Sequence, residues 1–303
     1  MKVISVVNQK GGVGKTNLVT NLSAYLANSG KKILLIDFDP QANATSGFGI
    51  GKDKKGIYEI LNNEISIDDV AVEVKKNLFL IPANQDLVGA TIEWVNQPER
   101  ESILKKTLAS LNADSRGLDA DSRGLDADSR RLDADSRRLN ADQRRVDFDF
   151  VFIDTPPSLG LLTVNSLIAA DYLIVPVQAE YYALEGLSSL LNTVNLIKKA
   201  CPVPLSGTGG SESNLDILGA VITMYDKRSH LSYEVWEELY QHFPGSIFRT
   251  IIPRNIRLAE APSFGQSILD YDPLSAGARA YKRLAKEFLV EISRVSHKFY
   301  FEN

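Results

Sequence analysis

Residues 3–16 read Val-Ile-Ser-Val-Val-Asn-Gln-Lys-Gly-Gly-Val-Gly-Lys-Thr, and this stretch decides the fold. A mostly apolar run predicts a buried strand, a glycine-rich segment follows it, and a helical pattern begins at Lys15. This order is the context that a phosphate-binding loop requires, because glycines let backbone N–H groups converge on an anion at the positive end of a helix. The stretch therefore predicts an α/β protein that binds a nucleotide.

The loop supplies most of the candidate contacts to that nucleotide. The Lys15 ammonium provides a positive charge for the β- and γ-phosphates, and the Thr16 hydroxyl is the expected Mg²⁺ ligand. We therefore expect ATP and Mg²⁺ as cofactors. The predicted nucleotide-binding residues of the loop are Gly11, Gly12, Val13, Gly14, Lys15, Thr16 and Asn17.

The spacing of the loop departs from the ordinary pattern Gly-x-x-x-x-Gly-Lys-[Ser/Thr]. That pattern would place a glycine at position 9, where this chain has Gln9. A second lysine, Lys10, stands at the start of the glycine-rich part instead. The loop is thus a deviant form with a lysine at each end.

Short apolar runs alternate with helical patterns along most of the chain, which is typical of a parallel sheet wrapped by helices. We predict an α/β fold in which helices cover both faces of a mostly parallel, twisted sheet, and a single domain over residues 1–303. The predicted strands are residues 3–7, 32–37, 78–83, 150–154, 172–176, 217–223 and 251–252. The predicted helices are residues 15–29, 57–61, 99–111, 159–169, 182–199, 232–243 and 275–296.

A low-complexity insert interrupts this domain at residues 111–145, where a heptapeptide of the type Leu-Asp-Ala-Asp-Ser-Arg-Arg repeats in tandem. Only its leucine is strongly apolar, so the repeat lacks the paired apolar seam of a coiled coil. Its eight aspartates and eight arginines cancel, which excludes a basic tail for nucleic acid. It is either a solvated helical extension or a disordered insert, and we expect no core chemistry from it. A glycine- and serine-rich segment at residues 206–213 predicts a flexible surface loop.

Composition limits the class of function. The net charge of −4 excludes a globally basic DNA-binding protein, although it permits a local basic patch. A single cysteine excludes a disulfide framework, and the three histidines are too scattered for a zinc pattern. The apolar run at the N-terminus is too short for a signal peptide or a membrane span. These observations favour a cytoplasmic protein.

Two later strands end in aspartate. Residues 35–40 read Leu-Ile-Asp-Phe-Asp-Pro, and residues 151–157 read Val-Phe-Ile-Asp-Thr-Pro-Pro. Aspartates at strand ends beside a phosphate loop are suited to hold Mg²⁺ or to polarise a water molecule. The second segment has the pattern of the Mg²⁺-binding strand of P-loop proteins, which makes Asp154 a candidate metal ligand.

The loop that carries Lys10 resembles that of the ParA/MinD/nitrogenase-iron-protein group of deviant P-loop ATPases. The resemblance implies a deviant P-loop NTPase fold in which Lys10 reaches across a homodimer to the partner's ATP. It also implies that Asp39 orients the attacking water and that Asp37 lies near the water shell of the metal. The candidate catalytic residues are Lys10, Lys15 and Asp39, and the candidate metal ligands are Thr16, Asp37 and Asp154.

Residues 222–228, 251–263 and 271–277 resemble chromosomal ParA proteins of the Soj type. The resemblance implies that Pro253 and Asn255 contact the adenine, and that Arg228 and Arg257 bind DNA phosphates without sequence preference. Weaker DNA contributions are expected from Lys227, Arg249 and Arg254.

The same resemblance implies a function: a nucleoid-associated ATPase that segregates chromosomes or plasmids. Its ATP-bound sandwich dimer would bind DNA, and a ParB-type centromere-binding protein would stimulate hydrolysis and so release it. One departure is Asn17, which stands where the family usually has threonine and is expected to weaken nucleotide contact modestly.

Three other functions compete with this one. A MinD-like membrane-associated ATPase would need an amphipathic membrane-binding helix within residues 280–303, and we expect no membrane partner. A non-hydrolysing DNA-binding scaffold would use the nucleotide only to gate dimerisation. An electron-transfer protein with a cluster between subunits is excluded, because Cys201 is the chain's single cysteine.

Overall fold

The computed structural model of the protein describes residues 1–114, 147–180, 183–200, 215–243 and 246–301. Within these residues, seven strands form one sheet in the order β3-β4-β2-β5-β1-β6-β7. Neighbouring strands are parallel, except that β3 and β4 form an antiparallel pair at one edge. The strands are β1 (Lys2–Val6), β2 (Ile33–Asp37), β3 (Val72–Lys75), β4 (Leu78–Ile81), β5 (Phe150–Asp154), β6 (Tyr172–Gln178) and β7 (Asp216–Thr223).

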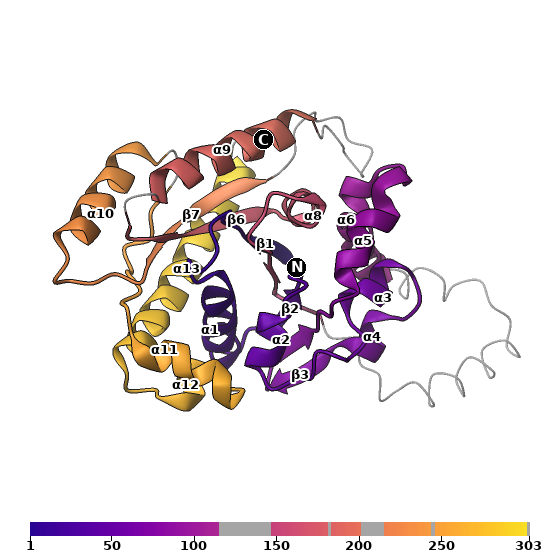
Figure 1. Ribbon diagram of the computed structural model, residues 1–303, viewed down its shortest axis with the longest axis horizontal. Helices are drawn as coiled ribbons and strands as arrows, with labels where there is room; N and C mark the ends of the chain where they lie inside the picture. The colour runs from indigo at the N-terminus through magenta and orange to yellow at the C-terminus, as the bar shows by residue number, and fades with distance from the viewer. Residues whose placement is uncertain (115–146, 181–182, 201–214, 244–245, 302–303) are drawn as a thin grey trace, which may run out of the picture.

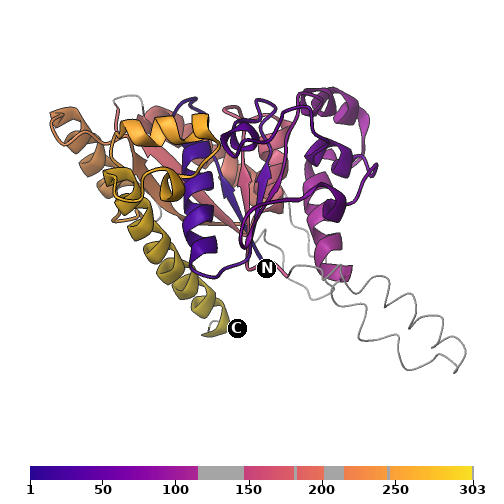
Figure 2. The same cartoon turned by 90° about the horizontal axis from the view of Figure 1, so that it is seen from below.

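Helices cover both faces of the sheet (Figures 1 and 2). The helices α1 and α13 pack together on one face, whereas α6, α8 and α9 contribute to the core on the other face. None of the described helices is long and apolar enough to cross a membrane. The helices are α1 (Lys15–Asn28), α2 (Asn43–Gly47), α3 (Ile57–Leu61), α4 (Ile67–Val70), α5 (Leu87–Glu93), η1 (Trp94–Asn96), η2 (Arg100–Ser102), α6 (Ile103–Asp114), α8 (Leu161–Ala169), α9 (Ala183–Ala200), α10 (His230–His242), α11 (Ile256–Glu260), η4 (Ala261–Phe264), α12 (Ile268–Tyr271) and α13 (Ala276–Phe301).

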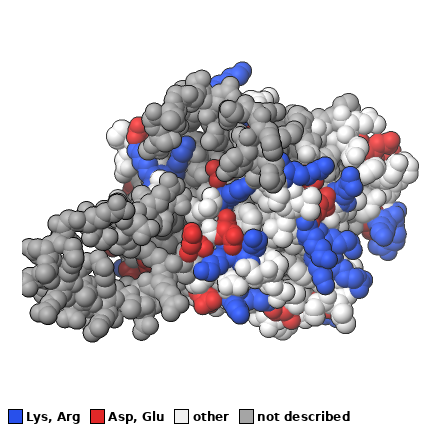
Figure 3. All heavy atoms as spheres, turned by 180° about the vertical axis from the view of Figure 1, so that it is seen from behind, with Lys and Arg blue, Asp and Glu red and all other residues white. Residues whose placement is uncertain are grey.

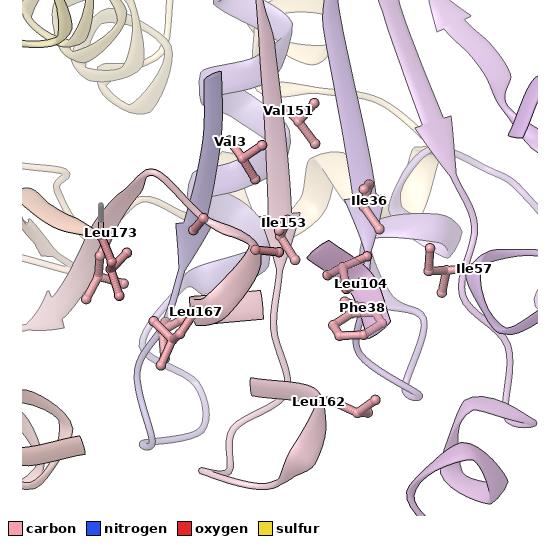
Figure 4. Packing of buried hydrophobic residues seen from close by; sticks show 14 of the residues in the cluster. Val3, Ile36, Phe38, Ile57, Leu104, Val151, Ile153, Leu162, Leu167 and Leu173 are labelled. Atoms are coloured by element: carbon pink, nitrogen blue, oxygen red, sulfur yellow. The ribbon is translucent and has the colours of Figure 1, made fainter. Parts of the chain in front are cut away.

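Residues of the central strands alternate between the two faces, as the two-residue period of a strand requires. Val151 and Ile153 of β5 join the core on the side of α6 and α8 (Figure 4). Phe150 and Phe152 point to the other face, where their rings lie 5.3 and 5.6 Å from the ring of Phe288 in α13. The predicted α/β fold, with a mostly parallel sheet covered on both faces, is confirmed.

One predicted strand is wrong. Residues 251–252 run beside β7 without forming a strand: Ile252 N donates to Ile222 O at 2.9 Å, and Pro253 makes an isolated bridge with Tyr225. This contact is too brief for a strand. The sequence also did not indicate several elements of at most seven residues, which are too short to establish a period: β3, α2, α4, α5, α11 and α12.

The heptapeptide repeat at residues 111–145 lies outside the described residues, except for its first four residues, which end α6. The glycine- and serine-rich segment at residues 206–213 also lies outside them.

Candidate functional site

The loop between β1 and α1 has a backbone that glycine adopts more readily than other residues. Gly12 and Gly14 have φ angles of 76° and 89°, in the left-handed region, and Gly14 directly precedes the first turn of α1. A side chain at either position would be strained. The loop therefore curls over the start of α1, where unpaired N–H groups and the helix dipole favour a bound anion.

Strands β6 and β7 hold this loop from outside. Asn8 Nδ2 donates to Pro176 O at 2.7 Å, and Thr223 Oγ1 donates to Val13 O at 2.8 Å. The bonded residues lie 168 and 210 positions apart along the chain. The shape of the loop thus depends on the strand order as well as on its own glycines.

Lys15 is buried inside the loop. Its Nζ donates to Asn8 O at 3.0 Å and to Lys10 O at 3.2 Å. Burial lowers the pKa of Lys15, and the nearby carboxylates of Asp154 and Asp39 partly offset this. The structure thus brings the loop lysine and two of the predicted aspartates close enough to interact.

Asp37 and Asp154 end the neighbouring strands β2 and β5 in register, and both are fully buried. Thr45 donates its backbone N–H and its hydroxyl to Asp37 Oδ2, each at 2.7 Å. Burial raises the pKa of Asp37 to about 6 despite these bonds. Burial also raises the pKa of Asp154 well above its ordinary value, and the negative charge of Asp37 adds to that rise. Two buried carboxyl groups side by side favour a cation next to them.

Asp154 is the residue that fits a metal best. In the part of the chain that the structure describes, neither of its oxygens has a hydrogen-bond donor in good geometry, although the Thr16 hydroxyl is close enough to lower its pKa in part. A buried carboxylate without partners is costly unless a cation compensates it. The described residues contain no group of three or more His, Cys, Asp or Glu side chains arranged to hold a metal alone. This suits Mg²⁺, which needs few protein ligands when water and phosphate oxygens complete its shell.

Asp39 lies just beyond the end of β2 and is also buried. Its Oδ1 accepts a hydrogen bond from Gln41 N at 2.9 Å, and its own N–H donates to Asp37 Oδ1 at 3.3 Å. These bonds fix the carboxylate beside the loop. A carboxylate held there can orient a water molecule, provided that a phosphate lies above the loop.

Lys10 differs from Lys15 in its surroundings. Its side chain is 35% exposed, and its Nζ donates to Glu180 Oε2 at 2.9 Å. Its backbone N–H donates to Asn8 Oδ1 at 2.9 Å. One lysine of the loop is therefore held inside it, whereas the other lies at its rim.

Several known proteins are similar in sequence to this chain over nearly its whole length. The AAA domain family matches residues 1–115 and 131–206. The sporulation initiation inhibitor protein Soj of Bacillus subtilis is 43% identical over 289 residues, which cover 94% of this chain and 97% of that protein. The chromosome-partitioning ATPase Soj of Treponema pallidum is 42% identical, with 95% of this chain and 97% of that protein covered. The chain belongs to the ParA/Soj family of partitioning ATPases.

Solved structures share the fold of this chain. The cobyrinic acid a,c-diamide synthase of Mycobacterium smegmatis, with bound ADP and magnesium, has a TM-score of 0.70 and 30% identity, covering 94% of this chain and 93% of that one. A plasmid partition protein of Borrelia burgdorferi bound to AMPPNP shares the fold, with a TM-score of 0.68 and 24% identity over 97% of this chain and 98% of that one. The present protein is a P-loop ATPase, as its partitioning relatives are. The synthase binds ADP and magnesium, and the plasmid partition protein binds the nucleotide analogue AMPPNP.

In this ParA/Soj chain, the unusual Asn17 links α1 to the C-terminal elements. Its Nδ2 donates to Leu258 O at 2.9 Å, and its Oδ1 accepts from the Tyr281 hydroxyl at 2.8 Å. The side chain is thus engaged with the C-terminal elements and not with the loop, and the nucleotide contact expected of Asn17 stays a prediction. Sequence reasoning missed this link, because its partners lie more than 240 positions away.

The predicted base contacts lie at the end of β7. Pro253 bridges Tyr225, and the Asn255 side chain caps α11 by accepting from Arg257 N at 3.0 Å. The cap uses the side-chain oxygen of Asn255 as an acceptor. The Asn255 Nδ2 group has no protein acceptor among the described residues. Adenine contact by either residue stays a prediction.

The two predicted DNA-binding arginines carry acidic neighbours. Arg228 is 90% exposed, and it pairs with Asp226 through Nε at 3.1 Å and Nη2 at 3.0 Å. These hydrogen bonds from Arg228 lower the pKa of Asp226 to about 2. Arg257 pairs with Glu260 at 2.9 Å and lies 3.6 Å from Asp272. Either arginine would have to share or leave its carboxylate to bind a phosphate.

The sequence prediction did not include a basic stripe on α13 in the DNA-binding surface. Four exposed cations stand at i, i+3, i+4 and i+7 of this helix and so share one face. Within the described ranges, none of the four forms an ion pair with a carboxylate. Lysine and arginine side chains also gather over part of the face seen in Figure 3. We call these four residues the α13 stripe: Arg279, Lys282, Arg283 and Lys286.

Proposed function

We propose that this protein is an ATP-dependent DNA-segregation ATPase whose ATP-bound sandwich dimer binds DNA without sequence preference. The observation that carries the proposal is the contrast between the two lysines of the loop. Lys15 is buried within the loop, where it serves its own chain's phosphates, while Lys10 lies half-exposed at the rim. A cation at the rim can reach a second molecule, which makes dimerisation dependent on the nucleotide.

Each residue of the site has its own role in the proposed hydrolysis of ATP. Backbone N–H groups of residues 11–16 hold the phosphates, and Lys15 neutralises charge that develops on the transferred phosphoryl group. Thr16 and Asp154 would hold Mg²⁺, with Asp37 acting on its water shell. When bound, Mg²⁺ would supply positive charge that offsets the negative charge of the phosphates. Asp39 orients the attacking water, and Lys10 of one chain contacts the phosphates of the other.

Two cationic regions are candidates for the DNA surface. Arg228 and Arg257 remain the predicted contacts, and the α13 stripe adds four cations that have no carboxylate partner within the described ranges. Gly277 at the start of α13 packs against Leu258 of α11, so the stripe and Arg257 stand on neighbouring elements. Contacts of this kind are to phosphates, and their strength falls steeply with salt.

We further propose the cellular setting that the family suggests. A ParB-type centromere-binding protein stimulates hydrolysis, the dimer opens and DNA is released. The protein acts in the cytoplasm on the nucleoid, with a chromosome or a plasmid as cargo. Its chain forms one domain over residues 1–303, interrupted by the repeat at residues 111–145.

The test measures binding of the purified protein to a DNA duplex with ATP, ADP or no nucleotide, at low and moderate salt. We expect binding with ATP alone, no binding by Arg228→Ala/Arg257→Ala, and a longer-lived complex in Asp39→Ala. A Lys54→Ala/Lys76→Ala variant removes two exposed cations elsewhere and serves as the matched control. DNA binding of equal strength with ATP, with ADP and without nucleotide would contradict the proposal. Binding to anionic liposomes instead of DNA would favour the MinD-like alternative.

A further inference from the structure

Glu180 lies at the rim of the loop and contacts three side chains. Its Oε2 accepts from Lys10 Nζ at 2.9 Å, and its Oε1 accepts from Gln178 Nε2 and lies 3.8 Å from Arg254 Nη2. The Glu180 side chain is 43% exposed and that of Arg254 is 65% exposed. One carboxylate is therefore shared between the loop lysine and an arginine from another element.

We propose that Glu180 is a positioning residue that holds Lys10 in its own chain and passes to Arg254 when Lys10 moves to a partner's nucleotide. The inference rests on the proposed function, in which Lys10 acts on the second molecule. An ammonium paired with Glu180 at 2.9 Å cannot at the same time contact phosphates of another chain. Pairing within the chain therefore competes with dimerisation.

Arg254 can neutralise Glu180 after Lys10 has left it. Once Lys10 leaves, Glu180 is an uncompensated negative charge on a surface that must approach another molecule's polyphosphate, and like charges repel. Arg254 lies close enough to take over the carboxylate by a side-chain rotation. Its backbone is fixed, because Arg254 N donates to Tyr225 O at 3.0 Å beside the end of β7. Glu180 follows the end of the neighbouring strand β6, so the exchange needs no movement of the sheet.

The exposure of the pair sets the size of the effect. Exposed ion pairs contribute little because solvent screens them, so removal of the Glu180 charge should change an equilibrium by about two- to fivefold. An effect of this size tunes the nucleotide concentration at which dimers form and does not prevent their formation.

The first experiment measures the pairing in the nucleotide-free protein. An amine-reactive reagent labels Lys10, and the labelled peptide is quantified by mass spectrometry over time. We expect Glu180→Gln to label Lys10 about two- to fivefold faster than the wild type. Glu237→Gln, which removes an exposed glutamate of α10, should label at the wild-type rate. Equal labelling of Lys10 in Glu180→Gln and wild type would overturn the proposal.

The second experiment measures dimerisation by sedimentation, with Mg²⁺ and a non-hydrolysable ATP analogue and without DNA. We expect Glu180→Gln to dimerise at about two- to fivefold lower nucleotide concentration and Arg254→Gln at higher concentration. The double variant should behave like Glu180→Gln, because Arg254 has no charge left to neutralise. Arg294→Gln, which removes an exposed arginine that pairs with Glu291 of α13, is the matched control. An Arg254→Gln defect that persists in the double variant would overturn the exchange.

A separate variant distinguishes the two proposals. Lys10→Ala should remain monomeric with the analogue. If it dimerises like the wild type, the action of Lys10 on a partner fails and with it the competition, even where labelling reports the pair with Glu180.

Discussion

Charged side chains gather in two regions: at the phosphate loop with the adjoining ends of β2 and β5, and on the α13 stripe. In the first region the lysine and the aspartates that face the phosphate site are buried, whereas in the second the cations are exposed to solvent. Lys15, Asp37 and Asp154 are each more than nine-tenths buried, and burial shifts the pKa of all three. The cations of the stripe are exposed on one helix face. In the loop each charge depends on a particular neighbour, whereas in the stripe the charges act together. Changes in the loop should therefore be severe and specific, and changes in the stripe graded and dependent on salt.

The largest effect is expected for Lys15→Ala. Removing the buried cation takes away charge stabilisation that no neighbour can replace, so ATP turnover should fall about a hundred- to a thousandfold. Turnover is measured by phosphate release at saturating ATP and Mg²⁺. Lys76→Ala, an exposed lysine between β3 and β4, should keep the wild-type rate. A fall of less than tenfold in Lys15→Ala would remove the distinction between the two regions.

A second prediction concerns stability and pH. Asp37 titrates near 6 in the folded protein and near 4 when unfolded, so the folded state binds this proton more tightly. Without nucleotide and Mg²⁺, the contribution of Asp37 to stability should fall by about 3 kcal/mol as the pH rises from about 4 to about 6, and should stay lower above that range. Asp37→Asn should flatten this dependence and be more stable than the wild type at neutral pH.

Urea unfolding between pH 4.5 and 7.5 checks this prediction, with Asp68→Asn as an exposed control in α4. An Asp37→Asn variant that keeps the full wild-type pH slope would assign the slope to other groups, such as Asp154.

The stripe should respond differently. Lys282→Gln/Arg283→Gln/Lys286→Gln is expected to weaken ATP-dependent DNA binding about tenfold at moderate salt, and to reduce the slope of log affinity against log salt by about 0.9 for each DNA phosphate that the variant no longer neutralises. Its ATP turnover without DNA should not change. Lys54→Gln/Lys55→Gln/Lys76→Gln changes the net charge equally at other exposed sites. Equal weakening in both variants would show that overall charge matters and the position of the stripe does not.

The smallest effect is expected where the two regions are connected. Tyr281 of α13 donates its buried hydroxyl to Asn17 of α1, at 2.8 Å. Tyr281→Phe removes this bond while the ring keeps its packing, and should lower the free energy of unfolding by about 1 kcal/mol. Tyr240→Phe, at an exposed tyrosine of α10, should be neutral. If neither variant changes the free energy of unfolding, the hydrogen bond between Asn17 and Tyr281 does not stabilise the packing of α1 against α13.

Much of the fold could be predicted because its signals are local. The first six predicted strands are present, since each is a continuous apolar run ended by polar or turn residues. Short elements such as α2 and β3 could not be predicted, because a few residues do not establish a period. The prediction of a strand at residues 251–252 was wrong because an apolar pair does not show how long its contact with a neighbouring strand will be, and here the contact with β7 is too brief.

The sequence by itself determined the chemistry of the loop and of the strand ends. Glycines at positions 12 and 14, a lysine and a threonine after them, and aspartates at the ends of two strands suffice to predict a nucleotide and a metal, since these properties belong to residue types and short spacings. Only the tertiary structure decided that Lys10 pairs with Glu180, that Asn17 bonds Tyr281, and that Arg228 and Arg257 carry carboxylate partners. For Glu180 and Tyr281 the physical reason is distance along the chain, because the order of the strands and the packing of α13 bring together residues far apart in sequence. The pairs of Arg228 and Arg257 join close neighbours, and there the reason is side-chain geometry, which sequence spacing leaves open.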